Sequence, residues 1–377
     1  MKNKKEILGQ FFTKQETVKK VLGILFEYVD NSKKLSILEP SSGTGNFIKI
    51  LNELGYKNIT GCEIDPELTD KPEDFFDMDL NKKFDLIVGN PPFTKYNLKD
   101  SYYYASKYKK SEISPNEYLS KQDIKIDKHK IENVFINKSI KHLKSDKSSI
   151  GFVLPISFFI KKKNLETKKN IVENFSSVII YQDDSVWFDR NIPCCFAIFT
   201  NNKDFEGRVV VIYKNSTDEH IENLELSSFL DEELIPQVIY NKKSGKLKNE
   251  KGISLSEYLS DDRVVVKKSF TENNISAKNI LELSKTKDQN ISDYKLAVVR
   301  VGNSSVGKSG LINIKKDTLN DMFFVFDFKD KYKNNKEIKE KITNLINSRH
   351  EYFRNITCRV GSKSIKKSDI LEMKIEI

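Results

Sequence analysis

Short apolar stretches alternate with amphipathic segments over the first 200 residues, and this alternation restricts the possible folds more than any other feature. Apolar residues recur at helical spacing over residues 16–31, and a strand-like run follows at 35–38. This order predicts an α/β fold with a mainly parallel sheet, whose ligands bind at the carboxyl ends of the strands. Further helices are predicted at 47–54 and 134–143, and further strands at 59–64, 84–88, 150–154, 178–181 and 195–199.

The amino-acid composition of the chain changes after residue 200. The length of 377 residues is enough for two domains. Polar segments rich in lysine and asparagine then separate short apolar runs, at 208–213, 264–266, 296–301 and 323–328. We therefore predict a catalytic domain over residues 1–205, a connecting segment over 206–245 and a second domain over 246–377.

Charge and cysteine content restrict the partners and the compartment. Lysine and arginine total 64 against 54 acidic residues, a net charge of +10. This excess fits a polyanionic partner, but a lysine-rich composition fits an AT-rich genome equally well. The four cysteines and four histidines show no metal-binding spacing, so we predict no metal site and a reducing cytoplasm. No apolar run reaches the roughly 18 residues of a membrane span.

Two turns that follow predicted strands carry residues suited to a small ligand. Gly43 and Gly45 permit a tight turn before a helix, whose unpaired N–H groups can bind a ligand. Glu39, at the end of the preceding strand, would repel a pyrophosphate and suits an ammonium group. Glu63, 18 positions past Gly45, is placed to bind ribose hydroxyls. A plain turn and a solvated acid are the alternatives.

The most specific pattern is Asn90-Pro91-Pro92-Phe93, which follows the strand predicted at 84–88. Two prolines can neither continue a strand ladder nor enter a helix interior, so they hold Asn90 rigidly at the edge of the sheet. The amide oxygen of Asn90 and the carbonyl of Pro91 are a pair of acceptors suited to a planar amino group. Phe93 adds a flat apolar face. A purely structural double-proline turn is the alternative.

With these motifs in this order, the chain resembles the gamma group of adenine-N6 DNA methyltransferases of restriction–modification systems, typified by the TaqI enzyme. The resemblance covers roughly residues 9–200. It implies a Rossmann-like S-adenosylmethionine-dependent methyltransferase sheet and a C-terminal α+β target-recognition domain. Asp77 and Asp79 remain competitors of Asp74 for the adenine of the cofactor. The resemblance assigns cofactor binding to Thr13, Glu39, Pro40, Ser41, Gly43, Gly45, Glu63, Ile64, Asp74, Phe75, Asn90 and Phe135.

The resemblance also implies catalysis by the motif at residues 90–93, on the N6 amino group of an adenine flipped out of the duplex. Phe93 would stack on this base together with either Trp187 or Phe188. The alignment with the family is uncertain by one residue here, so both remain candidates. The chain departs from the family at two positions. Lys14 stands where the family usually has proline, and Phe93 replaces the usual tyrosine, which keeps the stacking face and loses the hydroxyl.

Two regions are predicted to contact DNA. An insertion over residues 97–130 interleaves tyrosines with lysines, although a solvated loop is the alternative. Residues 302–309 fit a P-loop pattern, but a strand-like run follows in place of the required helix, so we predict a hairpin, with ATP binding as the alternative. Arginine and asparagine can read base edges, and lysine adds phosphate affinity. The candidate contacts in the second domain are Arg300, Asn303, Lys308, Arg359, Ser362 and Lys363.

The predicted function is therefore methylation of double-stranded DNA by a monomer that does not associate with membranes. A companion restriction endonuclease is compatible with the resemblance. Methyltransferases of RNA guanine-N2 or of protein glutamine also carry an Asn-Pro-Pro-aromatic motif and remain alternatives. So does a non-catalytic DNA specificity subunit.

Overall fold

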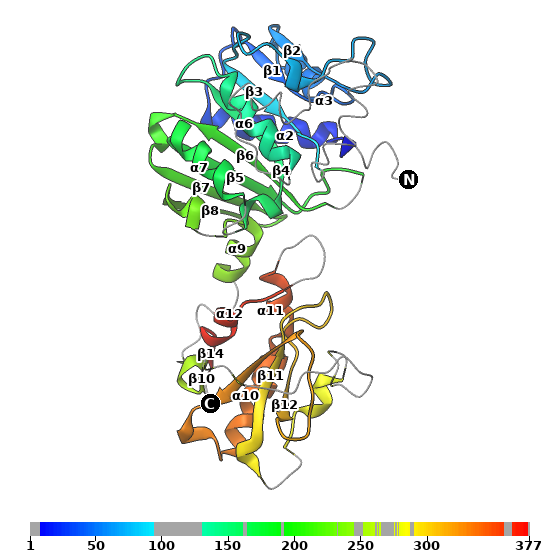
Figure 1. The fold of residues 1–377 in the computed structure, drawn as a ribbon. Coiled ribbons are helices and arrows are strands. Elements are labelled where there is room, and N and C mark those ends of the chain that lie inside the picture. The colour runs from blue at the N-terminus through cyan, green and yellow to red at the C-terminus, as the bar shows by residue number, and fades with distance from the viewer. Residues whose placement is uncertain are drawn as a thin grey trace. The chain divides into compact units, whose positions relative to one another are not determined.

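The computed structural model describes residues 8–93, 130–160, 164–189, 192–231, 233–244, 252–260, 279–286, 290–357 and 364–375, together with residues 262, 264, 275 and 277. The chain divides into two compact units, Met1–Pro236 and Gln237–Ile377 (Figure 1). Most of the predicted DNA-contacting insertion, residues 97–129, lies outside the described residues. The same holds for three candidate DNA contacts, Arg359, Ser362 and Lys363.

An eight-stranded sheet forms the centre of the first unit, in the order β2-β1-β3-β4-β6-β5-β7-β8 (Figure 1). β1 pairs in parallel with β2 and β3, and β3 with β4, whereas β6 runs antiparallel between β4 and β5. The predicted Rossmann-like α/β fold is confirmed, but the sheet is mixed. Its strands are β1 (Ile37–Glu39), β2 (Ile59–Gly61), β3 (Leu86–Gly89), β4 (Ser149–Pro155), β5 (Ser177–Asp183), β6 (Cys194–Thr200), β7 (Arg208–Lys214) and β8 (Glu219–Glu225).

Helices pack on this sheet through apolar residues spaced by about 3.6 positions. In α2 the fully buried residues Val18, Val21, Leu22 and Leu25 share one core with Ile37 of β1 and with apolar side chains of α3. α2 contacts β6, while α6 contacts β4 and α7. The helices of the first unit are α2 (Gln15–Tyr28), α3 (Asn46–Glu53), α6 (Ile131–Lys141), α7 (Leu165–Asn174) and α8 (Ser228–Asp231), and α9 (Pro236–Ser244) begins at the division between the two units.

The prediction of a connecting segment over residues 206–245 is wrong for its first half. β7 is buried over Val209–Tyr213 because it lies between β5 and β8 within the sheet. Within the described residues β8 pairs only with β7, and its exposure alternates because successive side chains point to opposite faces of the sheet. The sheet therefore continues to Glu225, and the division between the units falls at Pro236.

The second unit is built on a four-stranded antiparallel sheet, in the order β10-β13-β11-β12, and a two-stranded sheet of β14 and β9. One apolar core joins residues of β11 and β13 to Ile342, Ile346 and Phe353 from the helices. The predicted α+β fold is thereby confirmed. Its elements are β9 (Ile253–Ser254), β10 (Leu259–Ser260), β11 (Tyr294–Val299), β12 (Ser309–Asn313), β13 (Phe323–Phe328), β14 (Lys374–Ile375), α10 (Lys336–Ser348), α11 (His350–Asn355) and α12 (Lys367–Leu371).

The P-loop-like residues 302–309 lie in the turn of a hairpin, as predicted. β11 and β12 pair antiparallel on either side of this turn. Ser309, which would bind a metal ion in a P-loop, is buried and donates its hydroxyl to the Thr343 carbonyl at 3.1 Å. Because a strand follows the glycines, the helix N-terminus that cradles phosphate in a P-loop is missing from this turn. Within the described part of the chain, no helix is both long and apolar enough to cross a membrane.

Candidate functional site

A pocket opens at the carboxyl ends of β1, β2 and β3 in the first unit. Its lining joins carboxylates, backbone groups and aromatic rings, a mixture that suits a ligand with both polar and flat apolar parts. Of the predicted cofactor-binding residues, only Gly45 is not part of its lining. The others that line it are Thr13, Glu39, Pro40, Ser41, Gly43, Glu63, Ile64, Asp74, Phe75, Asn90 and Phe135.

The glycine turn between β1 and α3 adopts backbone angles that favour glycine. Gly43 and Gly45 have φ values of +53° and +75°, and a Cβ on Gly43 would lie 3.1 Å from the Phe12 ring. Glu63 braces this turn, since one carboxylate oxygen accepts from Gly43 N at 2.6 Å and the other from Asp65 N at 2.8 Å. The carboxylate predicted to bind ribose is thus held here by the backbone of the glycine turn.

Glu39 is a buried acid with no positively charged partner among the described residues. Its side chain lies over Gly89, and its Oε2 atom has no hydrogen-bond partner among the described residues. Burial, together with the neighbouring charge of Glu63, raises the pKa of Glu39 well above its usual range. An unpaired buried carboxyl is costly, so this position fits the ammonium group of a methionine-like ligand.

Of the three aspartates that could bind the adenine of the cofactor, the structure brings Asp74 to the pocket. Asp74 lines the pocket, and its carboxylate caps the short 3₁₀ helix Phe75–Asp77 by accepting from Phe76 N at 2.9 Å. Asp77 and Asp79 are not part of the pocket lining as far as the structure describes it. The carboxylate of Asp79 accepts instead from Asn81 N.

An aromatic wall stands beside Asp74. The Phe135 ring from α6 lies 5.2 Å from Phe75 and 5.1 Å from Phe76, measured between ring centroids. Lys138, one turn further along α6, is fully buried and donates to the carbonyls of Phe76 and Met78 at 2.7 and 3.2 Å. The lysine therefore ties the 3₁₀ helix to α6, and the wall offers apolar faces for a planar ring.

Asn90 presents a buried acceptor to the pocket. Its Nδ2 group donates to the Phe11 carbonyl at 2.5 Å, and this contact with a pure acceptor fixes which way the amide points. Its Oδ1 atom is buried and has no hydrogen-bond partner in the described parts of the chain. The backbone carbonyl of Asn90 accepts from the Ser41 hydroxyl at 3.1 Å. The amide is thus oriented by the protein with its oxygen left for a donor.

Phe188, and not Trp187, lies beside the Asn-Pro-Pro-Phe motif. Phe93 and Phe188 meet edge to face with ring centroids 6.0 Å apart, and Phe11 stacks on Phe93 at 5.9 Å. Trp187 packs on Tyr181 at 6.4 Å and donates its indole N–H to Asp183 at 2.7 Å. The sequence left open whether Trp187 or Phe188 lies beside the motif, and in the structure Phe188 is the residue next to Phe93.

Sequence reasoning missed the part that residues 9–13 play through their backbone. The carbonyl of Gly9 accepts from Phe93 N at 3.0 Å, and that of Thr13 accepts from the Asn46 side chain at 2.7 Å. Phe12 covers Gly43, and the carbonyl of Phe11 orients Asn90. Of these residues only Thr13 was predicted to bind the cofactor, and the side chains at 9–13 do not reveal these carbonyl contacts.

The candidate DNA contacts that the structure describes belong to the hairpin turn of the second unit. Arg300 follows β11 and donates its Nε–H to the Asp321 carbonyl at 2.5 Å, with its guanidinium 3.8 Å from the Asp321 carboxylate. Asn303 and Lys308 lie within the turn between β11 and β12. Arg300 is thus engaged within the protein.

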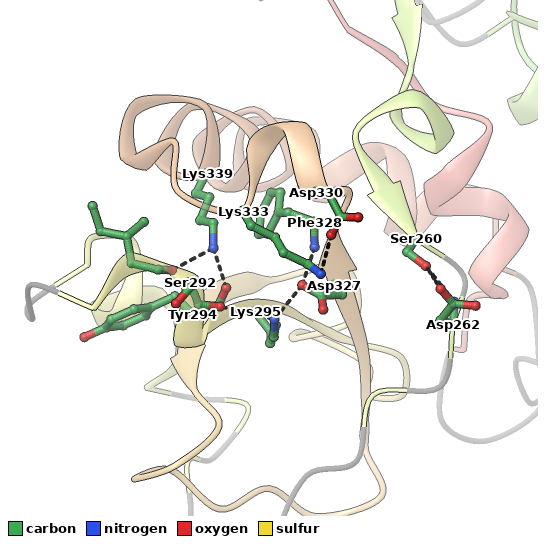
Figure 2. A network of polar contacts seen from close by, with 11 residues as sticks. Ser260, Asp262, Ser292, Tyr294, Lys295, Asp327, Phe328, Asp330, Lys333 and Lys339 are labelled. Carbon is green, nitrogen blue, oxygen red and sulfur yellow. Dashed lines mark hydrogen bonds and ion pairs between the residues drawn. The ribbon is translucent and has the colours of Figure 1, made fainter.

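Charged side chains are also buried inside the second unit, where they are paired. Lys339 is fully buried and donates to the carbonyls of Ile291 and Tyr294, both at 2.8 Å (Figure 2). Lys295 pairs with Asp327 at 2.6 Å. Burial and the Lys295 charge lower the pKa of Lys339 to about 8. No group of three or more histidine, cysteine, aspartate and glutamate side chains that could hold a metal occurs in the described ranges.

Comparison with known proteins agrees with this geometry. Residues 43–187 match the Eco57I restriction-modification methylase family. The predicted resemblance to restriction–modification DNA methyltransferases is confirmed. S-adenosylmethionine is the cofactor that the family match implies, and the chemistry of Glu39, Asp74 and the aromatic wall fits it.

Curated relatives match over a longer part of the chain. The type II methyltransferase M.HincII of Haemophilus influenzae is 32% identical over 231 residues, which are 59% of this chain and 40% of the relative. M.HindII of Haemophilus influenzae strain Rd is also 32% identical over 231 residues, 59% and 39% of the two chains. Modification methylase CviBIII of a Paramecium bursaria Chlorella virus is 29% identical over 168 residues, 41% and 39%. The match therefore spans about two fifths of these relatives.

Proposed function

We propose that this chain transfers a methyl group from S-adenosylmethionine to the N6 amino group of adenine in double-stranded DNA, as the modification enzyme of a restriction–modification system. The observation that carries the proposal is the amide of Asn90. Its nitrogen is held by the Phe11 carbonyl, and its buried oxygen lacks a donor among the described residues. An exocyclic amino group supplies such a donor.

The pocket residues divide the work of holding the cofactor, which supplies an electrophilic methyl group when bound. Glu39 suits the ammonium group, because its carboxyl is buried and its Oε2 atom has no hydrogen-bond partner among the described residues. Asp74 suits the adenine amino group, and Phe75 and Phe135 suit the faces of the adenine ring. Glu63 would share its carboxylate between the Gly43 N–H and the ribose hydroxyls.

Asn90 and Pro91 would act on the target adenine through their oxygens. By accepting both amino hydrogens, they draw the nitrogen toward a tetrahedral geometry in which its lone pair is nucleophilic. The protein contributes positioning and electrostatics.

The aromatic cluster next to Asn90 suits a flipped base. Extrusion of a base costs a few kcal/mol, and stacking on aromatic rings returns about 1–3 kcal/mol per base. Phe188 is only 1% exposed, so the base would enter by separating Phe188 from Phe93.

The second unit is the candidate for DNA target recognition in this proposal. Its hairpin turn carries Arg300, Asn303 and Lys308, side chains that can contact base edges and phosphates. A companion restriction endonuclease and a monomeric state also belong to the proposal.

One experiment tests the proposed function directly. The protein is incubated with methyl-labelled S-adenosylmethionine and mixed-sequence DNA, and modified bases are mapped. We expect N6-methyladenine at one defined sequence. Methylation of cytosine overturns the base assignment, and methylation of RNA or protein alone overturns the substrate class. Absence of any transfer favours a non-catalytic specificity subunit.

A further inference from the structure

The carboxylate of Asp183, at the carboxyl end of β5, accepts hydrogen bonds from five donor groups. Its Oδ1 atom accepts from the Trp187 indole at 2.7 Å and from the backbone N–H and the hydroxyl of Ser185 at 3.0 and 2.6 Å. Its Oδ2 atom accepts from the Tyr181 hydroxyl at 3.0 Å and from the Lys20 ammonium. Every acceptor direction of a largely buried carboxylate is therefore used within the protein.

These donors come from three different elements. Lys20 belongs to α2 and Tyr181 to β5, while Ser185 and Trp187 belong to the segment that leads to Phe188. Burial acts in the opposite direction, but hydrogen bonds from Lys20, Ser185 and Trp187 lower the pKa of Asp183, so the group is charged at neutral pH. Hydrogen bonds to a charged group are stronger than those between neutral groups, so the cluster fixes the path of residues 184–187.

That path determines where Phe188 lies. The carbonyl of Trp187 accepts from Lys14 N at 3.0 Å, and its indole packs on Tyr181. With the backbone and the side chain of Trp187 both held, the next residue is directed to Phe93 and Phe11. Asp183 itself is not part of the cofactor pocket lining.

We propose that Asp183 is a positioning residue for the target base, because it holds residues 184–187 so that Phe188 faces Phe93. The inference rests on the proposed function and adds a group to it. A defect at Asp183 then impairs capture of the base and spares the cofactor, since none of the five donor groups belongs to a residue that lines the cofactor pocket.

The first test compares Asp183→Asn with the matched control Asp85→Asn. Asp85 is likewise a carboxylate that accepts from a serine, Ser36, and from a lysine, Lys144, but it lies at the opposite end of the sheet, before β3. The measurements are kcat/KM for DNA, the Kd for S-adenosylmethionine by calorimetry, and the fluorescence of 2-aminopurine placed at the mapped target adenine.

We expect Asp183→Asn to lower kcat/KM for DNA about 10- to 100-fold, the effect of a small misplacement of a positioned group. The 2-aminopurine signal of base flipping should fall in parallel, while the Kd for the cofactor stays within about twofold. Asp85→Asn should leave all three quantities within about twofold of the unmodified protein.

A second readout does not depend on DNA. Trp187 is the single tryptophan of the chain, so the intrinsic indole emission reports on this cluster alone. Asp183→Asn should shift the emission maximum and raise quenching by acrylamide, and Asp85→Asn should do neither. If Asp183→Asn does not fold, Lys20→Met removes one donor and should change kcat/KM and the emission in the same direction by a smaller factor.

The outcomes separate this inference from the proposed function. Normal kcat/KM of Asp183→Asn, in a protein that methylates adenine, overturns the positioning role and leaves the function intact. An equal loss of cofactor affinity, or an unchanged Trp187 emission, also overturns it. Failure of the unmodified protein to methylate any DNA overturns the proposed function, and the role of Asp183 in base capture with it.

Discussion

Both units bury polar side chains that are paired within the protein, such as Lys138 in the first, but the pocket of the first unit also buries polar atoms that lack a partner among the described residues. In the second unit Lys339 is fully buried and bonded to two carbonyls, and Lys295 is paired with Asp327 (Figure 2). In the first unit Glu39 Oε2 and Asn90 Oδ1 are buried with no hydrogen-bond partner in the described ranges. Since an unmade hydrogen bond in the interior is costly, the paired groups serve stability and the unpaired ones await a ligand.

Asn90→Ala removes one of the unpaired buried groups and should have the largest effect on activity. Loss of one oriented hydrogen-bonding group in an active site lowers the rate on the order of 10²–10³-fold. The Kd for the cofactor should stay nearly unchanged, because Glu39 and Asp74 remain. Methyl transfer and calorimetric binding are measured side by side.

The control for Asn90→Ala is Asn52→Ala, which removes an exposed asparagine of α3 that bonds only within its helix. It should behave like the unmodified protein. Near-normal methylation by Asn90→Ala would contradict the assignment of Asn90 as the acceptor.

Lys339→Met, in contrast to Asn90→Ala, should lower the stability of the protein and leave cofactor binding unchanged. The change leaves the carbonyls of Ile291 and Tyr294 without their donor, which costs about 2–4 kcal/mol. Urea unfolding is followed by circular dichroism for the whole chain and by Trp187 emission for the first unit. Only the circular dichroism midpoint should move, and an unchanged midpoint would refute a stabilising role.

Glu39→Gln should separate binding from stability at a single residue. Without the carboxylate, the Kd for S-adenosylmethionine should rise roughly tenfold, the equivalent of about 1.4 kcal/mol. The protein without cofactor should become more stable, because a buried acid beside Glu63 is replaced by a neutral amide. A lower melting temperature of the variant without cofactor would contradict this interpretation of Glu39.

The pH dependence of stability gives a further test of Glu39. Burial raises its pKa in the folded state, so above its usual value of 4.5 the folded protein retains a proton that the unfolded chain has lost. The contribution of Glu39 to stability is therefore present below pH 4.5 and declines as the pH rises toward the raised pKa. Melting temperatures across this range should fall more steeply for the unmodified protein than for Glu39→Gln.

The smallest expected effect concerns Lys308 on the surface of the second unit. Lys308→Ser should weaken DNA binding a few-fold and reduce the slope of log affinity against log salt by about 0.9, the value for one phosphate contact. Binding is measured by fluorescence anisotropy at several salt concentrations. An unchanged slope would remove Lys308 from the proposed DNA contacts.

Local patterns were sufficient to predict much of the fold and of the pocket. Glu39 and Asn90 each end a short apolar stretch, so their place at the carboxyl edge of the sheet follows from strand order, whereas Asp74 was assigned through the family resemblance. β7 and β8 were assigned to a connecting segment because the lysine- and asparagine-rich sequence around them resembles a linker, while β5, the strand that holds β7 in the sheet, lies earlier in the chain.

The contacts that orient the site could not be predicted in the same way. Phe11 acts on Asn90 through its carbonyl, an atom that every residue possesses. The choice between Trp187 and Phe188 depends on the bond from the indole to Asp183, which only the folded loop reveals. Sequence patterns record side-chain character, whereas these features depend on backbone atoms and on loop conformation.

The bond between Phe11 and Asn90 has a consequence for how the protein is made. It joins residues 79 positions apart, and the same Phe11 ring also contacts Phe188, which lies between β5 and β6 in the chain. Contacts between residues distant in sequence form late, because a long loop must first close. A nascent chain that has not yet emerged past Phe188 therefore lacks the complete aromatic cluster, and we expect catalytic competence to arise only when most of the first unit has been synthesised.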